Sequence, residues 1–310
     1  MMKHILCRAF LIGFSIVAMN SCSTFDGPSD ITDPTMDQEY VLLSDSWEFL
    51  RKDAIDHAIR VAAYLNSDIG ITGGPSDEGK AHVTLDGGQS WIMSDSSVEC
   101  LFGLDVVSPL VDWQCSLGPV ARSVDGGQTW ESVNDFGNYC KFLSFLDAST
   151  GWIASTDNLG ITIDGGGNWQ SVSLPEDMSE IMAISLQAPN EGAVLDTTGR
   201  LFVTVDGGET WQERILPIGD AQISEVETAS AGLRFLDNQH GLVLLHVTGN
   251  SQSKVVEFQT TDGGMNWVLV DVAETPMFVS LYLSHDASYL TITNMMKPEI
   301  VLLKRKDGFK

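Results

Sequence analysis

The sequence predicts an all-β protein folded as a single β-propeller, because two short repeats recur at the length of one blade. A phrase of the form Ser/Thr-x-Asp-Gly-Gly-x-Ser/Thr/Asn-Trp occurs five times, at spacings of 39, 39, 42 and 56 residues. One four-stranded propeller blade has about this length. We expect six blades, with seven as the alternative. The aspartate and tryptophan residues of the five copies are Asp86 and Trp91, Asp125 and Trp130, Asp164 and Trp169, Asp206 and Trp211, and Asp262 and Trp267.

Each copy of this phrase reads as a tight β-hairpin turn. Two glycines after the aspartate permit the positive φ angles of a sharp reversal. The aspartate and the flanking hydroxyl groups can bond nearby backbone N–H groups and so hold the turn from inside. The tryptophan then begins the next strand, where its large amphipathic ring can cover the edge of the blade. We expect the aspartates to have this structural role.

The second repeat marks the innermost strand of each blade. It consists of an aromatic residue, Leu, Asp or Asn, and a glycine six residues after the aromatic, and we expect it where the first strand turns into the second. Clear copies run from Tyr64 to Gly70, Phe145 to Gly151 and Phe235 to Gly241, and looser ones from Leu101 to Asp105, Leu186 to Gly192 and Tyr282 to Tyr289.

The last unit lacks one strand, which the beginning of the chain can supply. No Asp-Gly-Gly phrase follows Tyr282, so this unit holds three strands, up to about Leu303. Near the N-terminus, Ser46-Trp47-Glu48-Phe49 resembles the end of the phrase, as in Ser90-Trp91. We therefore expect the N-terminal strand to close the last blade. Such closure removes the open sheet edges that invite aggregation.

The five phrases resemble the Asp-box, or BNR, repeat of sialidases, sortilin-type receptors, xyloglucan hydrolases and photosystem II stability/assembly factors. Together with the Phe-Leu-Asp-x-x-x-Gly pattern, residues 44–304 are most similar to the assembly factors and their bacterial relatives. The resemblance implies that each phrase joins the third and fourth strands of a blade, and that the protein is a scaffold for another protein. Photosynthetic members carry an arginine-rich patch, whereas the arginines here are dispersed along the sequence. The resemblance thus implies the architecture and leaves the partner open.

The first residues indicate export and a lipid anchor. Lys3 and Arg8 precede an apolar run, residues 9–19, which has the length of a signal-peptide core and is short for a membrane span. Met19-Asn20-Ser21-Cys22 is similar to a bacterial lipobox, although Met19 and Asn20 replace the commoner residues. The similarity implies a signal peptide over residues 1–21 and acylation of Cys22, with ordinary cleavage beside an incidental cysteine as the alternative.

The chain then divides into a tether and one domain. Residues 22–39, rich in Ser, Pro and Asp, are expected to be a flexible acidic tether, and residues 40–310 the propeller. We expect a location in the bacterial cell envelope, at the outer membrane or the cell surface, with membrane contact through the lipid anchor only.

The acidic composition excludes several classes of partner. The chain has 42 acidic and 17 basic residues, a formal net charge of −25. Nucleic acids and anionic lipid surfaces both require a basic footprint, so neither is an expected partner. The histidines are scattered and no metal-ligand spacing such as His-Glu-x-x-His occurs, so we expect neither a metal nor a cofactor.

Three cysteines follow Cys22, namely Cys100, Cys115 and Cys140. An oxidising compartment permits a disulfide, and Cys100 with Cys115 is the candidate pair because it would pin the first two strands of one blade. The alternative is that all three are small buried hydrophobic residues.

The sequence favours binding over catalysis. Sialidases carry a Phe/Tyr-Arg-Ile-Pro phrase before the first repeat, whereas Arg214-Ile215-Leu216-Pro217 here follows the fourth and contains an extra leucine. The expected function is a non-catalytic scaffold that binds an envelope protein or a glycan. The alternative is a glycoside hydrolase, sialidase-like or another glycanase, with an unrecognised pair of carboxylates. We expect the partner on the face opposite the phrases, where loop lengths vary. The candidate contacts are Trp113, Phe136, Tyr139, Arg214 and Asp220.

Overall fold

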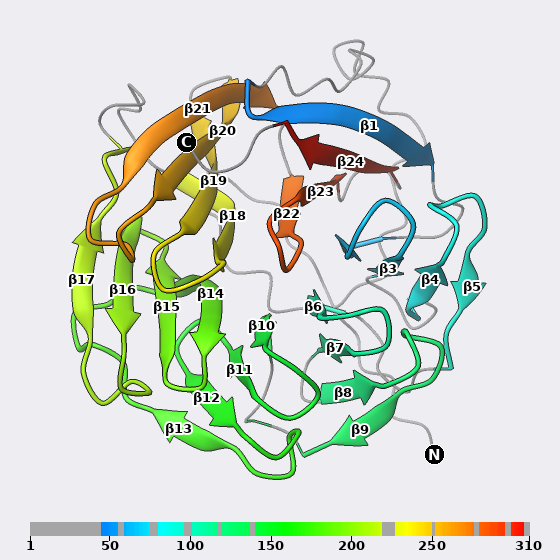
Figure 1. Cartoon of the computed structure of the whole chain (residues 1–310), viewed down its shortest axis with the longest axis horizontal. Coiled ribbons are helices and arrows are strands. Elements are labelled where there is room, and N and C mark those ends of the chain that lie inside the picture. The colour runs from blue at the N-terminus through cyan, green and yellow to red at the C-terminus, as the bar shows by residue number, and fades with distance from the viewer. Residues whose placement is uncertain are drawn as a thin grey trace, which may run out of the picture.

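The computed structural model describes residues 45–54, 59–74, 80–95, 101–116, 120–134, 136, 140–218, 227–249, 252–275, 279–294 and 299–306. Within these ranges the chain forms six four-stranded antiparallel sheets, arranged as blades around a central axis (Figure 1). The predicted six-bladed propeller is therefore confirmed, and the seven-bladed alternative is wrong. The predicted signal peptide, Cys22 and the tether lie outside the described residues. Among the described residues there is no helix of the length and hydropathy that a membrane span requires.

Blades I to V each follow the chain from the innermost to the outermost strand. Blade I contains β2 (Val61–Tyr64), β3 (Gly70–Gly73), β4 (His82–Thr84) and β5 (Ile92–Met93). Blade II contains β6 (Gly103–Val106), β7 (Asp112–Cys115), β8 (Val120–Ser123) and β9 (Glu131–Val133). Blade III contains β10 (Phe142–Phe145), β11 (Gly151–Ala154), β12 (Leu159–Thr162) and β13 (Gln170–Val172). Blade IV contains β14 (Ile181–Ala188), β15 (Glu191–Asp196), β16 (Arg200–Thr204) and β17 (Gln212–Ile215). Blade V contains β18 (Glu227–Phe235), β19 (Gly241–Gly249), β20 (Gln252–Thr260) and β21 (Val268–Thr275).

Blade VI joins the two ends of the chain. Its strands are β22 (Val279–Leu283), β23 (Tyr289–Asn294), β24 (Glu299–Arg305) and, on the outside, β1 (Trp47–Ala54). Trp47 pairs with Arg305, and the Lys306 N–H donates a 2.9 Å hydrogen bond to the Ser46 carbonyl. Figure 1 shows β1 lying along β24 at the rim of the ring. The predicted closure of the last blade by the N-terminal strand is therefore confirmed.

The aromatic-to-glycine repeat has a steric cause. Phe145 lies directly opposite Gly151 in the β10–β11 pair, and a Cβ added to Gly151 would lie 2.0 Å from the phenyl ring. Tyr64 covers Gly70 in the same way, at 2.5 Å. Only a glycine leaves room for an aromatic ring that lies across its own strand partner. The repeat therefore marks the first turn of a blade because it packs the blade from within.

Blade II departs from this pattern. Val106 and Asp112 occupy the places that the aromatic residue and the glycine hold in blades I, III and V. The predicted copy from Leu101 to Asp105 is wrong in register, because β6 runs on to Val106 and turns only after it. Both side chains are buried in this blade, which has no aromatic ring at that place.

The turns divide the molecule into two faces. The first-to-second and third-to-fourth turns of every blade lie on one face, which we call the turn face. The second-to-third turns and the links between blades lie on the opposite face, the link face. Since β24 ends and β1 begins on the turn face, Ser46 and Lys306 both lie there.

The disulfide differs from the expected pair. Cys115 is bonded to Cys140, with a Cα–Cα distance of 5.7 Å, and Cys100 lies outside the described residues. Cys115 ends the second strand of blade II, and Cys140 precedes the first strand of blade III. The Cys140 N–H donates a 2.9 Å hydrogen bond to the Ser116 carbonyl, which brings the two cysteines together. The disulfide therefore links two blades, whereas the prediction placed it within one.

Candidate functional site

The Asp-Gly-Gly turns use their carboxylates internally. Asp206 Oδ1 accepts hydrogen bonds from the Thr204 hydroxyl (2.7 Å) and the Thr210 N–H (2.9 Å), and Oδ2 accepts one from the Thr210 hydroxyl (2.6 Å). These bonds, those from Thr210 first, lower the pKa of Asp206 to about 2. The turns at Asp86, Asp125, Asp164 and Asp262 repeat the arrangement. Such carboxylates stay ionised and hold their own turns, which leaves them unsuited to acid–base catalysis.

The tryptophans of the phrases fasten turns and blades. The Trp130 and Trp267 indoles donate to glycine carbonyls of their own turns, at 2.9 and 3.1 Å. The Trp169 and Trp211 indoles instead donate to backbone carbonyls of the preceding blade, at 2.7 and 2.9 Å. Trp91 packs edge-on against Tyr64. These rings contribute to the framework of the propeller.

Around the axis, one position recurs in every innermost strand, namely the residue just before the one that holds the aromatic place of the repeat, which is Leu186 in blade IV and Leu283 in blade VI. In three consecutive blades its side chain bonds the backbone of the next blade. Asp105 accepts from the Phe145 N–H at 2.7 Å, Ser144 from the Leu186 N–H at 2.9 Å, and Ser185 from the Phe235 N–H at 2.9 Å. These bonds join blades II to V in a chain. The equivalent residues of blades V, VI and I are Arg234, Tyr282 and Ala63.

Arg234 and Tyr282 complete this ring across the axis. Arg234 donates to the Leu283 carbonyl at 3.2 Å and to Asp105 at 3.4 Å, so that it joins blade V to blades VI and II. Ala63 has no polar group, and the Tyr282 hydroxyl reaches past it to accept the Val106 N–H at 3.0 Å. Burial would raise the pKa of Asp105, but nearby His285 and Arg234 hold it below its usual range. This end of the axis is filled by groups that bond one another.

The link-face end of the axis is different. One residue precedes the innermost strand in each blade, and in blades I to IV these residues are Arg60, Phe102, Lys141 and Glu180. The backbone N–H groups of the first three bond the end of their own second strand, at Gly73, Cys115 and Ala154, which fixes them in equivalent places. The Arg60 guanidinium lies 4.4 Å from the centre of the Phe102 ring. We call Arg60, Phe102 and Lys141 the axial cation site.

The pKa of the Lys141 ammonium is lower than that of an ordinary lysine. This pKa is lowered chiefly because the ammonium is partly buried. The nearby Glu180 charge acts in the opposite direction, and the Arg60 charge adds a smaller lowering effect. Lys141 also lies 5.1 Å from the Phe142 ring. Among the described residues, no carboxylate oxygen lies within 4 Å of the Lys141 ammonium. A carboxylate ligand would therefore relieve the repulsion between two cations.

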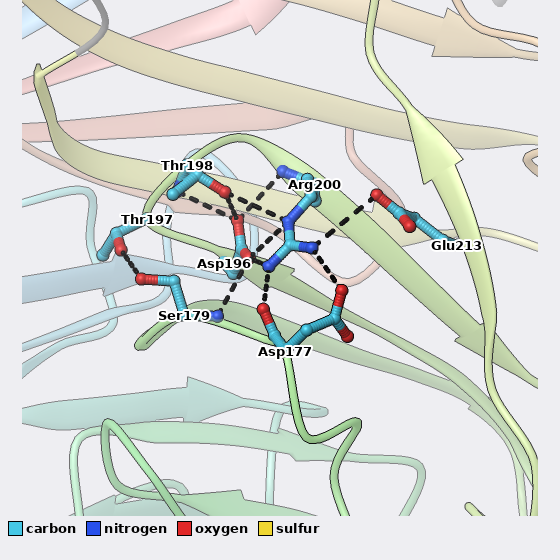
Figure 2. A network of polar contacts seen from close by, with 7 residues as sticks. All are labelled: Asp177, Ser179, Asp196, Thr197, Thr198, Arg200 and Glu213. Carbon is cyan, nitrogen blue, oxygen red and sulfur yellow. Dashed lines mark hydrogen bonds and ion pairs between the residues drawn. The ribbon is translucent and has the colours of Figure 1, made fainter.

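A polar network orders the chain beside this site. Asp196 is fully buried, and its oxygens accept hydrogen bonds from Thr198 and Ser179. Arg200 forms ion pairs with Asp196 and Asp177 at 3.1 and 3.0 Å, as Figure 2 shows. The Thr197 N–H of the same turn donates a 2.9 Å bond to the Glu180 carbonyl. The network thereby ties the turn between β15 and β16 to Glu180, at the edge of the axial cation site.

The predicted contact residues do not form one surface. Trp113 is fully buried and stacks on Phe145 at 3.8 Å, so its place as a surface contact is wrong. Phe136 is partly buried and packs near Trp169, at 6.0 Å between ring centres. Arg214 lies on the outer strand of blade IV and bonds Gln212 and the Glu213 carbonyl. Tyr139 and Asp220 lie outside the described residues.

Two carboxyl groups, those of Asp105 and Asp112, are buried inside the propeller. Asp112 is 1% exposed, and burial raises its pKa to about 8, helped by the negative charges of Asp105 and Asp125. Asp112 is thus protonated at neutral pH, whereas Asp105 is ionised and bonded on both oxygens. Within the described ranges, no three His, Cys, Asp or Glu side chains gather as a metal site would require.

The structural comparisons find other propellers. The chain is similar to "YCF48 bound to D1 peptide" (15% identity, TM-score 0.50, covering 85% of this chain and 98% of that chain) and to YCF48 from Cyanidioschyzon merolae (13%, 0.51, 85% and 100%). It is also similar to the GH74 enzyme of Niastella koreensis (12% identity, TM-score 0.50). That match covers 81% of this chain and 44% of the enzyme chain. At these identities the likeness shows the fold alone. No family model and no curated protein match the chain.

Proposed function

We propose that this chain is a non-catalytic scaffold that binds an acidic segment of another protein at the axial cation site. The observation that carries the proposal is the pair of cations at one end of the propeller axis, with Arg60 over the Phe102 ring and Lys141 near the Phe142 ring. The two cations lie within electrostatic range of each other in a chain of net charge −25. Cations beside an aromatic ring suit a ligand that carries both carboxylates and apolar side chains. The similar structure of YCF48 bound to D1 peptide supports a peptide as the ligand.

We also propose that the protein acts in the bacterial cell envelope, anchored through acylated Cys22. The apolar run over residues 9–19 and the lipobox-like Met19 to Cys22 support export. The Cys115–Cys140 disulfide agrees with it, because disulfides persist in oxidising compartments. Mass spectrometry of the N-terminal peptide from purified membranes tests the anchor. Acyl chains on Cys22 are expected, and an unmodified Cys22 would overturn this part of the proposal.

The hydrolase alternative has less support. A glycosidase needs two carboxyl groups that reach the substrate, roughly 5 to 10 Å apart. Asp105 and Asp112 are fully buried, and Asp105 is occupied by Arg234, Tyr282 and a backbone N–H. The exposed Glu180 has no second carboxyl described beside it at the axial cation site. The carboxylates of the Asp-Gly-Gly turns hold their own turns. Binding is therefore the function that the described residues support best.

Fluorescence anisotropy with a labelled decapeptide of glutamate and phenylalanine tests the binding site. Arg60→Gln and Lys141→Gln are each expected to weaken binding about five-fold, the effect of losing about 1 kcal/mol of partly screened ion pairing. Rising salt should weaken binding as well. Lys304→Gln is the matched control, because it removes the same charge from an exposed position on β24. Circular dichroism verifies that each variant folds.

Two outcomes would contradict this proposal. Equal losses in Lys304→Gln and Lys141→Gln would show that only net charge matters. Tighter binding of polygalacturonate than of the peptide, with the same dependence on Arg60 and Lys141, would assign the site to an acidic glycan.

A further inference from the structure

The turn face carries a set of exposed aliphatic side chains that the axial cation site does not use. In four of the five Asp-Gly-Gly turns, the residue between the hydroxyl residue and the aspartate is aliphatic and points to solvent. We call these four residues the aliphatic ring. Its members, with their exposed fractions, are Leu85 (49%), Val124 (61%), Ile163 (73%) and Val205 (65%).

The turns themselves do not require aliphatic residues at this position. Blade V has Thr261 there, exposed to solvent, and its turn makes the same bonds between Thr260 and Asp262. Two further exposed leucines, Leu110 (60%) and Leu236 (37%), lie in first-to-second turns on the same face. All six of these exposed aliphatic side chains therefore lie on one face of the propeller, spread over its blades.

The attachment point of the N-terminal segment identifies the occupant of this surface. Ser46, the second residue of the first described range, lies on the turn face beside Lys306. Cys22 is only 24 residues before Ser46 in the sequence. In a chain acylated at Cys22, the segment that leads to the membrane would therefore be attached to the propeller at its turn face. Such an anchor raises the local concentration of lipid, so that weak apolar contacts become sufficient.

We propose that the turn face lies against a zwitterionic lipid surface, with the aliphatic ring inserted among the headgroups. The proposal rests on the anchoring through Cys22. The negative charge of the turn face determines which lipid headgroups it can approach. The turn aspartates have lowered pKa values, because their own turns bond them, and so remain ionised. Anionic headgroups would be repelled, whereas the ammonium groups of phosphatidylethanolamine are compatible with these carboxylates. The axial cation site then faces away from the membrane.

Hydroxyl-radical footprinting of the full chain tests this orientation. The acylated protein is reconstituted in phosphatidylcholine/phosphatidylethanolamine vesicles and compared with the Cys22→Ser protein in the same buffer. The oxidation rates of Leu85, Ile163 and Val205 are expected to fall at least three-fold on the vesicles. The internal controls are aliphatic residues on outer strands with similar exposure, Ile92 (53%) and Ile215 (78%), whose rates should not change.

A second measurement replaces the aliphatic ring with threonine, the residue that blade V has at this position as Thr261. A variant with Leu85→Thr, Val124→Thr, Ile163→Thr and Val205→Thr should rotate faster on the vesicle surface, by time-resolved anisotropy, with unchanged peptide affinity at the axial cation site. Equal protection of Ile92 and Leu85, or none at either, would overturn the proposal. Protection in native membranes and none on protein-free vesicles would also overturn it and assign the face to a protein. A failure of acylation would give a different result, because the protein would then not be incorporated into the vesicles at all.

Discussion

The Trp47 indole donates a 2.7 Å hydrogen bond to the Glu257 carboxylate of the neighbouring blade. Arg305, the strand partner of Trp47, donates a second 2.7 Å bond to the same carboxylate. Glu257 is 1% exposed, and the Arg305 guanidinium lies 5.3 Å from the centre of the Trp47 ring. One buried carboxylate on β20 therefore holds both ends of the chain where blade VI meets blade V.

Glu257→Ala is expected to destabilise the propeller by about 3 to 5 kcal/mol. Removal of one partner from a buried ion pair leaves the Arg305 charge and the Trp47 N–H without their acceptor. Urea unfolding followed by tryptophan fluorescence measures the loss. The control is Lys52→Ala, which removes the more exposed pair with Glu299 (3.1 Å) and should cost under about 1 kcal/mol. Similar losses in both variants would refute the special role of Glu257.

Gly151→Ala is expected to destabilise the protein by about 2 to 3 kcal/mol, because the new methyl group would overlap the Phe145 ring within the core. The cause is testable by a double-mutant cycle. In the background of Phe145→Leu, which removes the ring, the added cost of Gly151→Ala should be much smaller. Additive costs would mean that backbone effects, and not the overlap, explain the loss.

Reduction of the disulfide is expected to lower stability by about 3 kcal/mol, because the Cys115–Cys140 bond closes a 25-residue loop in the unfolded chain. Unfolding curves with and without dithiothreitol measure the difference. The variant with both Cys115→Ser and Cys140→Ser should match the reduced protein and should not respond to the reductant. A response in that variant would place the stabilising bond elsewhere.

Acid is expected to weaken the protein through His246. Burial in blade V lowers the pKa of His246 to about 4, whereas the unfolded side chain titrates near 6.5. Between these values only the unfolded state takes up the proton, so stability falls as the pH drops from 6.5 to 4, by about 3 kcal/mol in total. The carboxylates also titrate in acid, so the comparison with His246→Leu isolates the histidine. That variant should lose less stability over this range, and parallel curves would contradict the prediction.

The fold was predictable because its signals are local. An Asp-Gly-Gly turn and a glycine opposite an aromatic ring each constrain a few neighbouring residues, and both recur with the length of a blade. Even the closing strand was visible, since Trp47 stands where Trp91 stands in blade I. Blade II was placed in the wrong register because Val106 and Asp112 replace the aromatic residue and the glycine, so neither marker of the repeat is present.

The site was less predictable because it depends on contacts between blades. Trp113 was expected at the surface, yet it follows Asp112 as Trp152 follows Gly151, and it is buried like Trp152. An alignment of blades II and III that placed Asp112 opposite Gly151 would have predicted that Trp113 is buried. Arg60 and Lys141 follow no sequence motif, and only the register of the innermost strands brings them to one end of the axis. The Cys115–Cys140 pairing likewise depends on the distance between adjacent blades.

The pairing of Trp47 with Arg305 has a consequence for biosynthesis. The ribosome makes β1 first and β24 last, so β1 must wait for nearly the whole chain before its partner exists. Blades I to V can form in the order of their synthesis, because each is continuous in the chain. The polypeptide therefore passes through an incomplete ring of blades, whose two free sheet edges are open to pairing with other chains. Chaperones that cover exposed strand edges would be most needed during this interval.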